Sequence, residues 1–238
     1  MTINSGIPLP RNGDTDELPD ALSVAAHDVT EAVRVVTGYL ELLDAQAGDA
    51  LDETAQRYLG GVRDGLDHLE RVTSGVLAYV RVNVEPPDIG DVEVDVAFEE
   101  ALRPLVRSLD QHHARVIAED LPVVRADAGR TRDLLRALVA NAVAFAGDEP
   151  LVIELTAERD DDGWRFALRD NGIGLPEDAR ERVLQPFERA HSRTVATGPG
   201  LGLAIARCIV ERRGGRIQVD SGPAGTTVTF TVPDELPS

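Results

Sequence analysis

Three segments of the chain carry residue types that together could transfer a phosphoryl group. The first, AAHDVTEAVRVVTGYLELL (Ala25 to Leu43), places His27 beside an acid on a helix with periodic apolar residues. The other two, DNGIG and GPGLGLAI, come much later in the chain. A neutral imidazole is a nucleophile, and glycine loops let backbone amides approach a nucleotide closely. The pairing predicts a phosphoryl acceptor and a nucleotide site in one chain.

The composition is that of an intracellular globular protein with two domains. With 238 residues, 42% of them hydrophobic, the chain can bury a sizeable core. No apolar run approaches the roughly 18 residues of a membrane span, and the N-terminus lacks a secretory signal pattern. We therefore expect a cytoplasmic protein without direct membrane insertion. The net charge of −18 argues against nucleic acid as a partner, because the two would repel at long range.

Apolar periodicity predicts a helical hairpin over residues 17–83, after a flexible leader at residues 1–16 that is rich in Gly, Pro and Asn. Apolar residues recur in alternating steps of four and three along two helices, with a turn at Ala45 to Asp52. The first seam runs through Leu22, Ala26, Val29, Val33, Val36, Leu40 and Leu43, and the second through Leu59, Val62, Leu66, Leu69, Thr73, Val76 and Val80. Since each helix has one apolar stripe, we expect a homodimer in which two hairpins form a four-helix bundle.

A second domain is predicted over residues 91–238, after a linker at residues 84–90 that contains two prolines. Helices are predicted over Val96 to Gln111, Gly129 to Phe145, Pro176 to Leu184 and Gly202 to Arg213. Strands are predicted over Ala114 to Ala118, Leu151 to Glu158, Trp164 to Arg169, Arg216 to Ser221 and Thr226 to Val232. Their mixed order predicts an α+β fold, an α/β sandwich with the helices on one face of the sheet.

These motifs, in this order, make the chain resemble the transmitter core of two-component sensor histidine kinases. HDVTEAVRVVTGYLELL is similar to the acceptor box of their phytochrome-like branch, and DNGIG and GPGLGLAI resemble the glycine boxes of a Bergerat (GHKL) ATP-binding domain. The resemblance covers Leu18 to Pro233. It implies a protein-histidine kinase that uses ATP and Mg²⁺ to phosphorylate His27 and passes the phosphoryl group to an aspartate of a response-regulator receiver domain. Because no sensor domain precedes the hairpin, we expect either input from a separate sensor protein or a fragment.

His27 carries the reaction in this interpretation, and Asp28 assists it. Asp28 can hold one ring N–H and fix the tautomer, which leaves the lone pair of the other ring nitrogen free to attack phosphorus. The alternative is an exposed helical histidine that merely has an acidic neighbour. Two nearby positions depart from the family: Ala32 replaces a proline, which should straighten the helix, and Glu31 stands where kinases with strong phosphatase activity carry threonine or asparagine.

The first glycine box is implied to bind the adenosine end of ATP. By resemblance, the Asp170 carboxylate accepts a hydrogen bond from the adenine amino group, while Gly172 and Gly174 let the backbone approach the base and ribose. Thr226 is assigned to the same nucleotide site. Taken alone, DNG is also the sequence of an ordinary tight turn.

The second glycine box is implied to bind the phosphates. Gly198, Gly200 and Gly202 lead into a helix, so backbone N–H groups and the positive end of the helix dipole can face phosphate oxygens. By resemblance, Phe187 packs beneath a nucleotide lid formed by AHSRTVAT, although it could equally be a core anchor. The basic candidates for phosphate contact are Arg189 and Arg193.

Asn141 is the implied magnesium ligand, through its amide oxygen. Positions 137, 141 and 144 lie along one helical stripe, and the family commonly carries a polar or acidic residue at the first of them and a basic residue at the last. This chain has Ala137 and Ala144 instead. The alternative to a kinase is therefore a histidine phosphotransfer protein with a degenerate ATP-binding domain. A nucleotide-gated clamp of the Bergerat type is disfavoured, because it needs a catalytic acid near Ala137 and has no use for His27.

Overall fold

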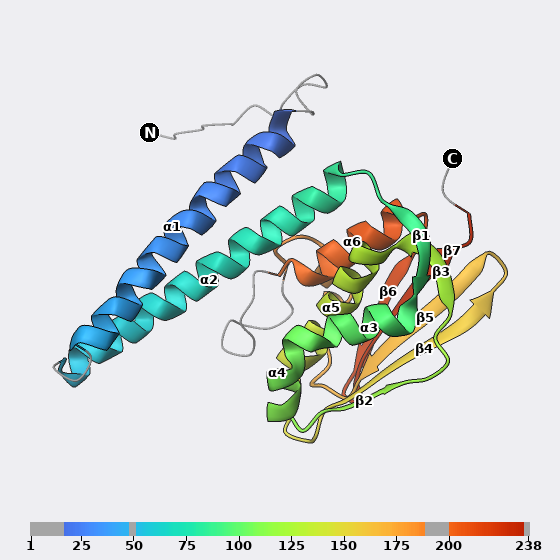
Figure 1. Ribbon diagram of the computed structural model, residues 1–238. Coiled ribbons are helices and arrows are strands. Elements are labelled where there is room, and N and C mark those ends of the chain that lie inside the picture. Colours follow the sequence, from blue (N-terminus) through green and yellow to red (C-terminus); the bar gives the residue numbers. More distant parts are fainter. Residues whose placement is uncertain (1–16, 48–50, 189–199, 236–238) are drawn as a thin grey trace, which may run out of the picture. The chain divides into compact units, whose positions relative to one another are not determined.

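The computed structural model describes residues 17–47, 51–188 and 200–235 (Figure 1). The chain separates into two compact units, Met1–Val84 and Glu85–Ser238. Within the described residues, no helix combines the length and the apolar character that a membrane crossing requires.

The first unit is a hairpin of two long helices, α1 (Glu17–Ala47) and α2 (Glu53–Val84), as the apolar periodicity predicts. Asp52 lies immediately before α2. Its Oδ1 accepts a hydrogen bond from the backbone N–H of Ala55 at 2.8 Å. A carboxylate in this position satisfies an amide that has no partner within the helix, so the start of α2 is fixed by its own sequence.

Packing between the two helices buries only part of the apolar seam. Val33 and Thr73 are buried, and Thr73 Oγ1 donates a hydrogen bond to the Leu69 carbonyl at 2.8 Å, which satisfies the hydroxyl group. Val36 and Val62, by contrast, leave 43% and 45% of their surface exposed. The hairpin by itself therefore leaves an apolar stripe in contact with solvent.

The second unit is built on a mixed five-stranded sheet with the order β2-β4-β5-β7-β6 (Figure 1). The strands are β2 (Arg115–Ala118), β4 (Val152–Asp160), β5 (Gly163–Asp170), β6 (Ile217–Gly222) and β7 (Gly225–Pro233). β2 pairs with β4 in parallel, and the other pairs are antiparallel. In the register of β5 and β7, Asp170, the last residue of β5, lies opposite Thr226, near the start of β7.

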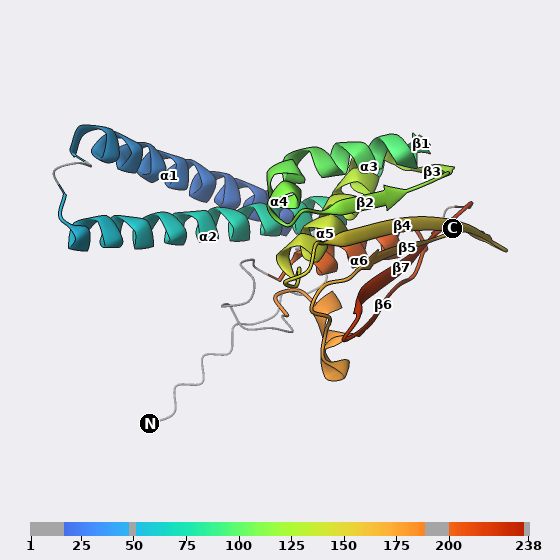
Figure 2. The ribbon, with the colours of Figure 1, turned by 90° about the horizontal axis from the view of Figure 1, so that it is seen from below.

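The helices of this unit lie on one side of the sheet (Figure 2). They are α3 (Val94–Leu102), α4 (Val106–Gln111), α5 (Ala128–Ala144) and α6 (Gly202–Arg212). On β5, Phe166 and Asp170 are buried, whereas Arg165 and Arg169, which point to the opposite face, are exposed. Phe166 stacks on Phe230 of β7 with ring centroids 5.0 Å apart. The predicted α+β class, with helices packed against a mixed sheet, is confirmed.

The structure has two strands that the sequence does not predict, β1 (Ile89–Glu93) and β3 (Val123–Asp127). They pair antiparallel, with Ile89 opposite Asp127. β1 reads IGDVE and lacks the β-branched alternation typical of a strand, and its first residues fall in the predicted linker at 84–90. Pairing with a distant segment, rather than local propensity, makes this segment a strand.

Two predicted helices are less regular than expected. The helix predicted over Val96 to Gln111 is interrupted by a 3-10 turn, η2 (Arg103–Leu105), between α3 and α4. Pro104 explains the break, since proline lacks the N–H that a continuous α-helix needs. The helix predicted over Pro176 to Leu184 is two separate 3-10 turns. These turns are η3 (Glu177–Ala179) and η4 (Arg182–Leu184).

Candidate functional site

Asp170 closes β5 and is only 5% exposed. Its Oδ1 accepts hydrogen bonds from the backbone N–H groups of Gly172, at 2.8 Å, and Thr226, at 3.2 Å. Burial raises the pKa of this carboxyl group, and the two hydrogen bonds oppose that shift. Within the described residues Oδ2 makes no hydrogen bond, so one oxygen of a fixed carboxyl group remains available to a donor on a ligand.

The DNGIG turn needs its glycines because other backbone segments approach them closely. A Cβ atom on Gly172 would lie 2.4 Å from the carbonyl oxygen of Phe145, and one on Gly174 would lie 2.0 Å from that of Gly222. Gly174 also has a φ of 70°, a conformation that favours glycine. Ile173, between the two glycines, donates its N–H to the Phe145 carbonyl at 2.9 Å. The turn is thereby fixed against the C-terminal end of α5.

Ser221 and Gly225 also stabilise this end of the sheet, and neither is predicted from the sequence. Ser221 Oγ lies 2.9 Å from Thr226 Oγ1 and accepts a hydrogen bond from the N–H of Leu175 at 2.8 Å. Gly225 has a φ of 121°, and a Cβ atom there would lie 1.9 Å from the carbonyl oxygen of Asp170. The Pro-Ala-Gly segment between two strand patterns is a turn signal that could have identified Gly225. The residues around Ser221 give no signal for its role, because its partner Leu175 is 46 positions away in the sequence.

Asn141 is half-buried near the C-terminal end of α5, one turn before Phe145. Its backbone carbonyl accepts the N–H of Phe145 at 3.1 Å, and its side-chain amide makes no hydrogen bond within the described part of the chain. One turn earlier, Ala137 lies beside the start of α6, since a Cβ atom on Gly202 would be 4.0 Å from that of Ala137. The last two turns of α5 therefore lie close to both the DNGIG turn and the first residue of α6.

The second glycine box leads into α6. Gly200 has a φ of 73°, and its carbonyl accepts the N–H of Phe187 at 3.0 Å. Gly202 is the first residue of the helix. Phe187 has a φ of 65° and is 61% exposed, which is not the exposure of a core anchor. Three residues that the sequence proposes for the phosphates lie outside the described residues: Gly198, Arg189 and Arg193.

The described residues contain no group of three or more His, Cys, Asp or Glu side chains that could hold a metal ion. On the stripe of α5, Ala137 is half-buried and Ala144 is exposed, and neither side chain can coordinate a cation. Of these three side chains, only that of Asn141 has an oxygen atom that can coordinate a cation. It suits Mg²⁺, which takes oxygen ligands and usually binds through a few protein groups together with phosphate oxygens.

His27 and Asp28 lie in the other unit, within α1. Asp28 is exposed. The helix continues without interruption past Ala32, as expected where the proline of the family is absent. Glu31, one turn after His27, forms an ion pair with Arg34. The predicted acceptor residues and the predicted nucleotide residues are therefore carried by different units.

Comparison with known proteins assigns the candidate nucleotide residues to a family of ATPases. Residues 126–236 match the family of histidine kinase-, DNA gyrase B- and HSP90-like ATPases. The chain is similar to phytochrome-like protein Cph1 of Synechocystis sp., with 31% identity over 88% of this chain and 28% of Cph1. It is also similar to the methanogenesis regulatory histidine kinase FilI of Methanothrix harundinacea, with 32% identity over 91% of this chain and 25% of FilI. The chain thus spans between a quarter and a third of these relatives.

Among solved structures, full-length ShkA in complex with AMPPNP has the same fold. The TM-score is 0.71 and the sequence identity is 26%, over 92% of this chain and 47% of ShkA. Asp170, Asn141 and Gly202 all fall within the matched ATPase region, and the alignments with Cph1 and FilI are long enough to include the hairpin. Residues 126–236 are therefore an ATPase domain of the histidine kinase, DNA gyrase B and HSP90 type, and the chain is homologous to sensor histidine kinases.

Proposed function

We propose that the chain is an ATP-dependent histidine autokinase that phosphorylates His27 and passes the phosphoryl group to an aspartate of a response-regulator receiver domain. The observation that carries this proposal is the buried Asp170 carboxyl group, held by two backbone N–H groups through Oδ1 alone. A fixed acceptor of this kind, beside a glycine turn, suits the amino group of adenine. The match of residues 126–236 to a family of ATPases supports ATP as the nucleotide.

Each end of the nucleotide has its own set of protein groups in this proposal. Asp170 accepts a hydrogen bond from the adenine amino group, while Gly172 and Thr226 hold the carboxylate in place. The phosphates lie at the start of α6, near Gly202, where unpaired backbone N–H groups and the positive end of the helix dipole favour negative charge. The exposed ring of Phe187, whose N–H is bonded to the loop before α6, covers one side of the nucleotide.

Mg²⁺ is the proposed second cofactor. The chemistry it would supply is neutralisation of the negative charge that develops on the phosphates during phosphoryl transfer. Asn141 is the side chain that would hold it, because its amide makes no hydrogen bond within the described part of the chain. Ala137 and Ala144 add no polar group, so the contribution of the protein to magnesium affinity should rest on Asn141.

The acceptor step uses the imidazole of His27. Asp28 accepts a hydrogen bond from one ring N–H, and the lone pair of the other ring nitrogen attacks the γ-phosphorus of ATP. A nitrogen–phosphorus bond forms as the bond to the β,γ-bridging oxygen breaks, and ADP leaves. The receiver carboxylate then attacks the same phosphorus, which forms an acyl phosphate and returns the imidazole.

The exposed part of the apolar seam supports a homodimer. Val36, Leu43, Val62 and Leu69 each leave between 42% and 45% of their surface exposed. A second hairpin would cover these side chains and complete a four-helix bundle, which is why we propose that two copies associate through α1 and α2. The variant Val36→Asp should be monomeric in light scattering, and a monomeric parent at micromolar concentration would contradict the dimer.

Phosphorylation of the purified chain tests the proposed function directly. With γ-labelled ATP and Mg²⁺, the parent should acquire acid-labile, base-stable label. His27→Gln should abolish the label while ATP binding persists, whereas the control His68→Gln, on the other helix of the hairpin, should keep it. Label that survives His27→Gln would assign the acceptor to another residue.

Nucleotide affinity, measured by calorimetry, tests the two ends of the site separately. ATP should bind more tightly with Mg²⁺ than with EDTA, and Asn141→Ala should remove this difference. Asp170→Asn should weaken binding under both conditions, because it acts on adenine. The double variant Ala137→Asn with Ala144→Lys should raise the rate of autophosphorylation.

A histidine phosphotransfer protein is the second candidate function. Ala137 and Ala144 favour it, since the stripe that faces the proposed phosphates offers Asn141 alone. Such a protein would accept a phosphoryl group on His27 from a phosphorylated receiver domain without using ATP. Absence of ATP binding to the parent at millimolar nucleotide would select this function over the kinase.

A further inference from the structure

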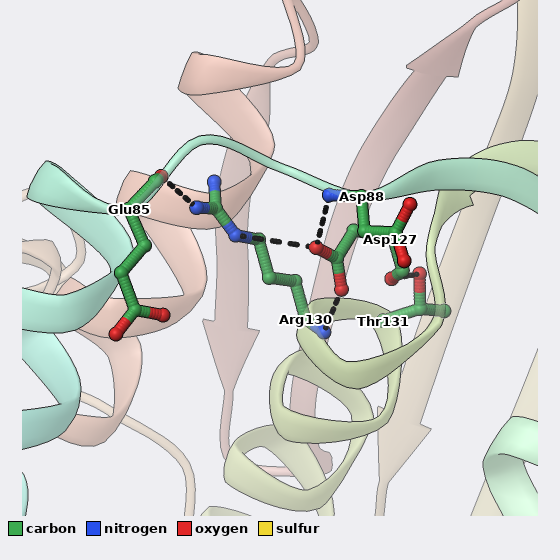
Figure 3. A network of polar contacts seen from close by, with 5 residues as sticks. All are labelled: Glu85, Asp88, Asp127, Arg130 and Thr131. Atoms are coloured by element: carbon green, nitrogen blue, oxygen red, sulfur yellow. Dashed lines mark hydrogen bonds and ion pairs between the residues drawn. The ribbon is translucent and has the colours of Figure 1, made fainter.

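The chain that follows the hairpin is fastened to the start of α5 by a group of four residues, Glu85, Asp88, Asp127 and Arg130, which we call the linker clamp (Figure 3). Asp127 caps α5, since its Oδ1 accepts the N–H of Arg130 at 2.9 Å. Its Oδ2 accepts the N–H of Asp88, also at 2.9 Å. The guanidinium group of Arg130 lies 3.7 Å from Asp127 Oδ2 and donates a hydrogen bond to the Glu85 carbonyl.

The Asp127–Arg130 pair is better shielded from solvent than the other ion pairs of the described residues, whereas Glu85 and Asp88, which it holds, are exposed. The side chains of Arg130 and Asp127 are 14% and 17% exposed, whereas those of Arg132 of α5 and Glu100 of α3, which also form an ion pair, are 44% and 42% exposed. Salt and water weaken exposed ion pairs, but they screen partly buried ones much less. The Asp127–Arg130 pair should therefore be screened little, and its two side chains form a fixed anchor for the backbone groups of Asp88 and Glu85.

The clamp restricts residues 85–88, which fall within the linker predicted at residues 84–90. Glu85 and Asp88 are held by the clamp, Pro86 and Pro87 between them restrict the backbone, and β1 begins at the next residue. The boundary between the two units accordingly falls at Val84 and Glu85. Residues 85–88, if released, would add up to about 14 Å of reach between the units.

The same helix links the clamp to the candidate nucleotide site. α5 has 17 residues, from Ala128 to Ala144, and so spans about 25 Å. Its first turn carries Arg130 and its last turn carries Asn141. Because an α-helix is stiff over this length, fixing the linker to its start also fixes the distance from Glu85 to the nucleotide site.

We propose that Asp127 and Arg130 are positioning residues for phosphoryl transfer to His27, an inference that rests on the proposed function. They confine movement between the units to the Val84–Glu85 junction and keep the tether that joins His27 to the bound nucleotide short. A shorter tether raises the effective concentration of one site at the other, and this concentration falls steeply as a flexible tether lengthens. Release of the clamp should therefore slow transfer without changing nucleotide affinity.

Two substitutions open the clamp selectively. Asp127→Asn keeps an oxygen that can cap α5, because Asn is as good an N-cap as Asp, but it replaces the oxygen that accepts the N–H of Asp88. Arg130→Gln removes the hydrogen bond to the Glu85 carbonyl. Arg130→Lys, which keeps a cationic donor, should recover part of the effect. The matched control is Arg132→Gln, which removes an arginine from the same helix without touching the linker.

The experiment compares three measurements on the full chain: autophosphorylation rate at saturating ATP, ATP affinity, and hydrogen exchange of the Asp88 amide. Asp127→Asn and Arg130→Gln should lower the rate about fivefold, leave ATP affinity unchanged, and accelerate exchange at Asp88. Arg132→Gln should change none of the three. Melting temperature serves as a check, because a merely structural role would lower it and weaken ATP binding as well.

The outcomes separate this inference from the proposed function. Faster exchange at Asp88 with an unchanged rate would overturn the positioning role while the kinase stands. Exchange that stays slow in both variants would show that the clamp does not hold the linker, which also overturns the inference. A parent that binds ATP but acquires no label would overturn the proposed function, and the positioning role with it.

Discussion

The two units specify their candidate sites in opposite ways. His27 and Asp28 are neighbours in sequence on one continuous helix, and their place in the chain requires only that α1 forms. Asp170 instead depends on Thr226 of β7 and Gly172 of the following turn, which itself rests on Phe145 at the end of α5. Local periodicity suffices for the first site, whereas the second needs the correct packing of distant segments. Substitutions of equal size should therefore have very different effects in the two units.

The largest contrast should come from truncating apolar side chains. Phe166 is 1% exposed and stacks on Phe230, so Phe166→Ala should destabilise the second unit by about 3 to 5 kcal/mol through lost contacts and a cavity. Leu42, on α1, is 55% exposed, and Leu42→Ala should change stability by less than about 0.5 kcal/mol. Urea unfolding followed by circular dichroism measures both. Similar losses from the two substitutions would contradict the contrast between the units.

Replacing a glycine with alanine should lower the stability of one unit and raise that of the other. Gly174→Ala places a side chain 2.0 Å from the Gly222 carbonyl at a φ of 70°, and should destabilise the second unit by about 3 kcal/mol. A Cβ atom on Gly65, an exposed position of α2, would meet no other atom within 4 Å. Gly65→Ala should therefore stabilise the hairpin by roughly 0.5 to 1 kcal/mol, because alanine favours helix. Thermal unfolding distinguishes the two, and a loss of stability in Gly65→Ala would show that α2 needs this glycine.

The parts of the molecule that the sequence predicts are those with a local signature. Both helices of the hairpin follow from apolar residues at steps of four and three, and the strands of the large sheet follow from apolar runs bounded by turn residues. The Asp170 turn and the start of α6 at Gly202 follow from glycine spacing. Each of these features is decided by residues within a few positions of one another.

The features that sequence reasoning missed are decided by partners far along the chain. β1 becomes a strand because it pairs with β3, and Asp88 is held by Asp127, 39 positions away. Ser221 owes its place to Leu175 and Thr226 rather than to its neighbours. Segments such as IGDVE carry too weak a propensity to reveal these contacts before the chain has packed.

A smaller change in stability than those above is expected from filling a cavity in the second unit. A cavity of about 50 Å³ lies beneath Pro87, between α5, α6 and the sheet, and Val94 and Val210 are among the residues that line it. Val210→Ile adds one methylene group to this space and should raise stability by about 1 kcal/mol. The same change at Val35 of α1, which is 50% exposed, adds a methylene group that stays in contact with solvent and should have little effect. Melting temperatures of the two variants provide the comparison, and destabilisation by Val210→Ile would mean that the cavity cannot accept the added group.

The smallest expected effect concerns the charge of Asp170 and its dependence on pH. Burial raises the pKa of this carboxyl group in the folded state, so its contribution to stability is fully present below the pKa of the unfolded chain and is lost as pH rises through the folded pKa. Asn at this position is neutral at every pH and keeps an oxygen for the N–H groups of Gly172 and Thr226. Without nucleotide, Asp170→Asn should therefore stabilise the second unit more at pH 7 than at pH 3.5.

Asp160, at the end of β4, provides the control of opposite sign. The N–H of Asp161 and the guanidinium group of Arg165 lower the pKa of its carboxyl group, so its contribution to stability is present above the unfolded pKa and is lost as pH falls. Asp160→Asn should destabilise the unit at pH 7 and matter less at pH 3.5. Urea unfolding at both pH values measures the two variants. If Asp170→Asn gives the same change at both, burial of this carboxyl group does not oppose folding. If it stabilises the free protein at pH 7 and yet weakens ATP binding, Asp170 is retained for the ligand, against the preference of the fold.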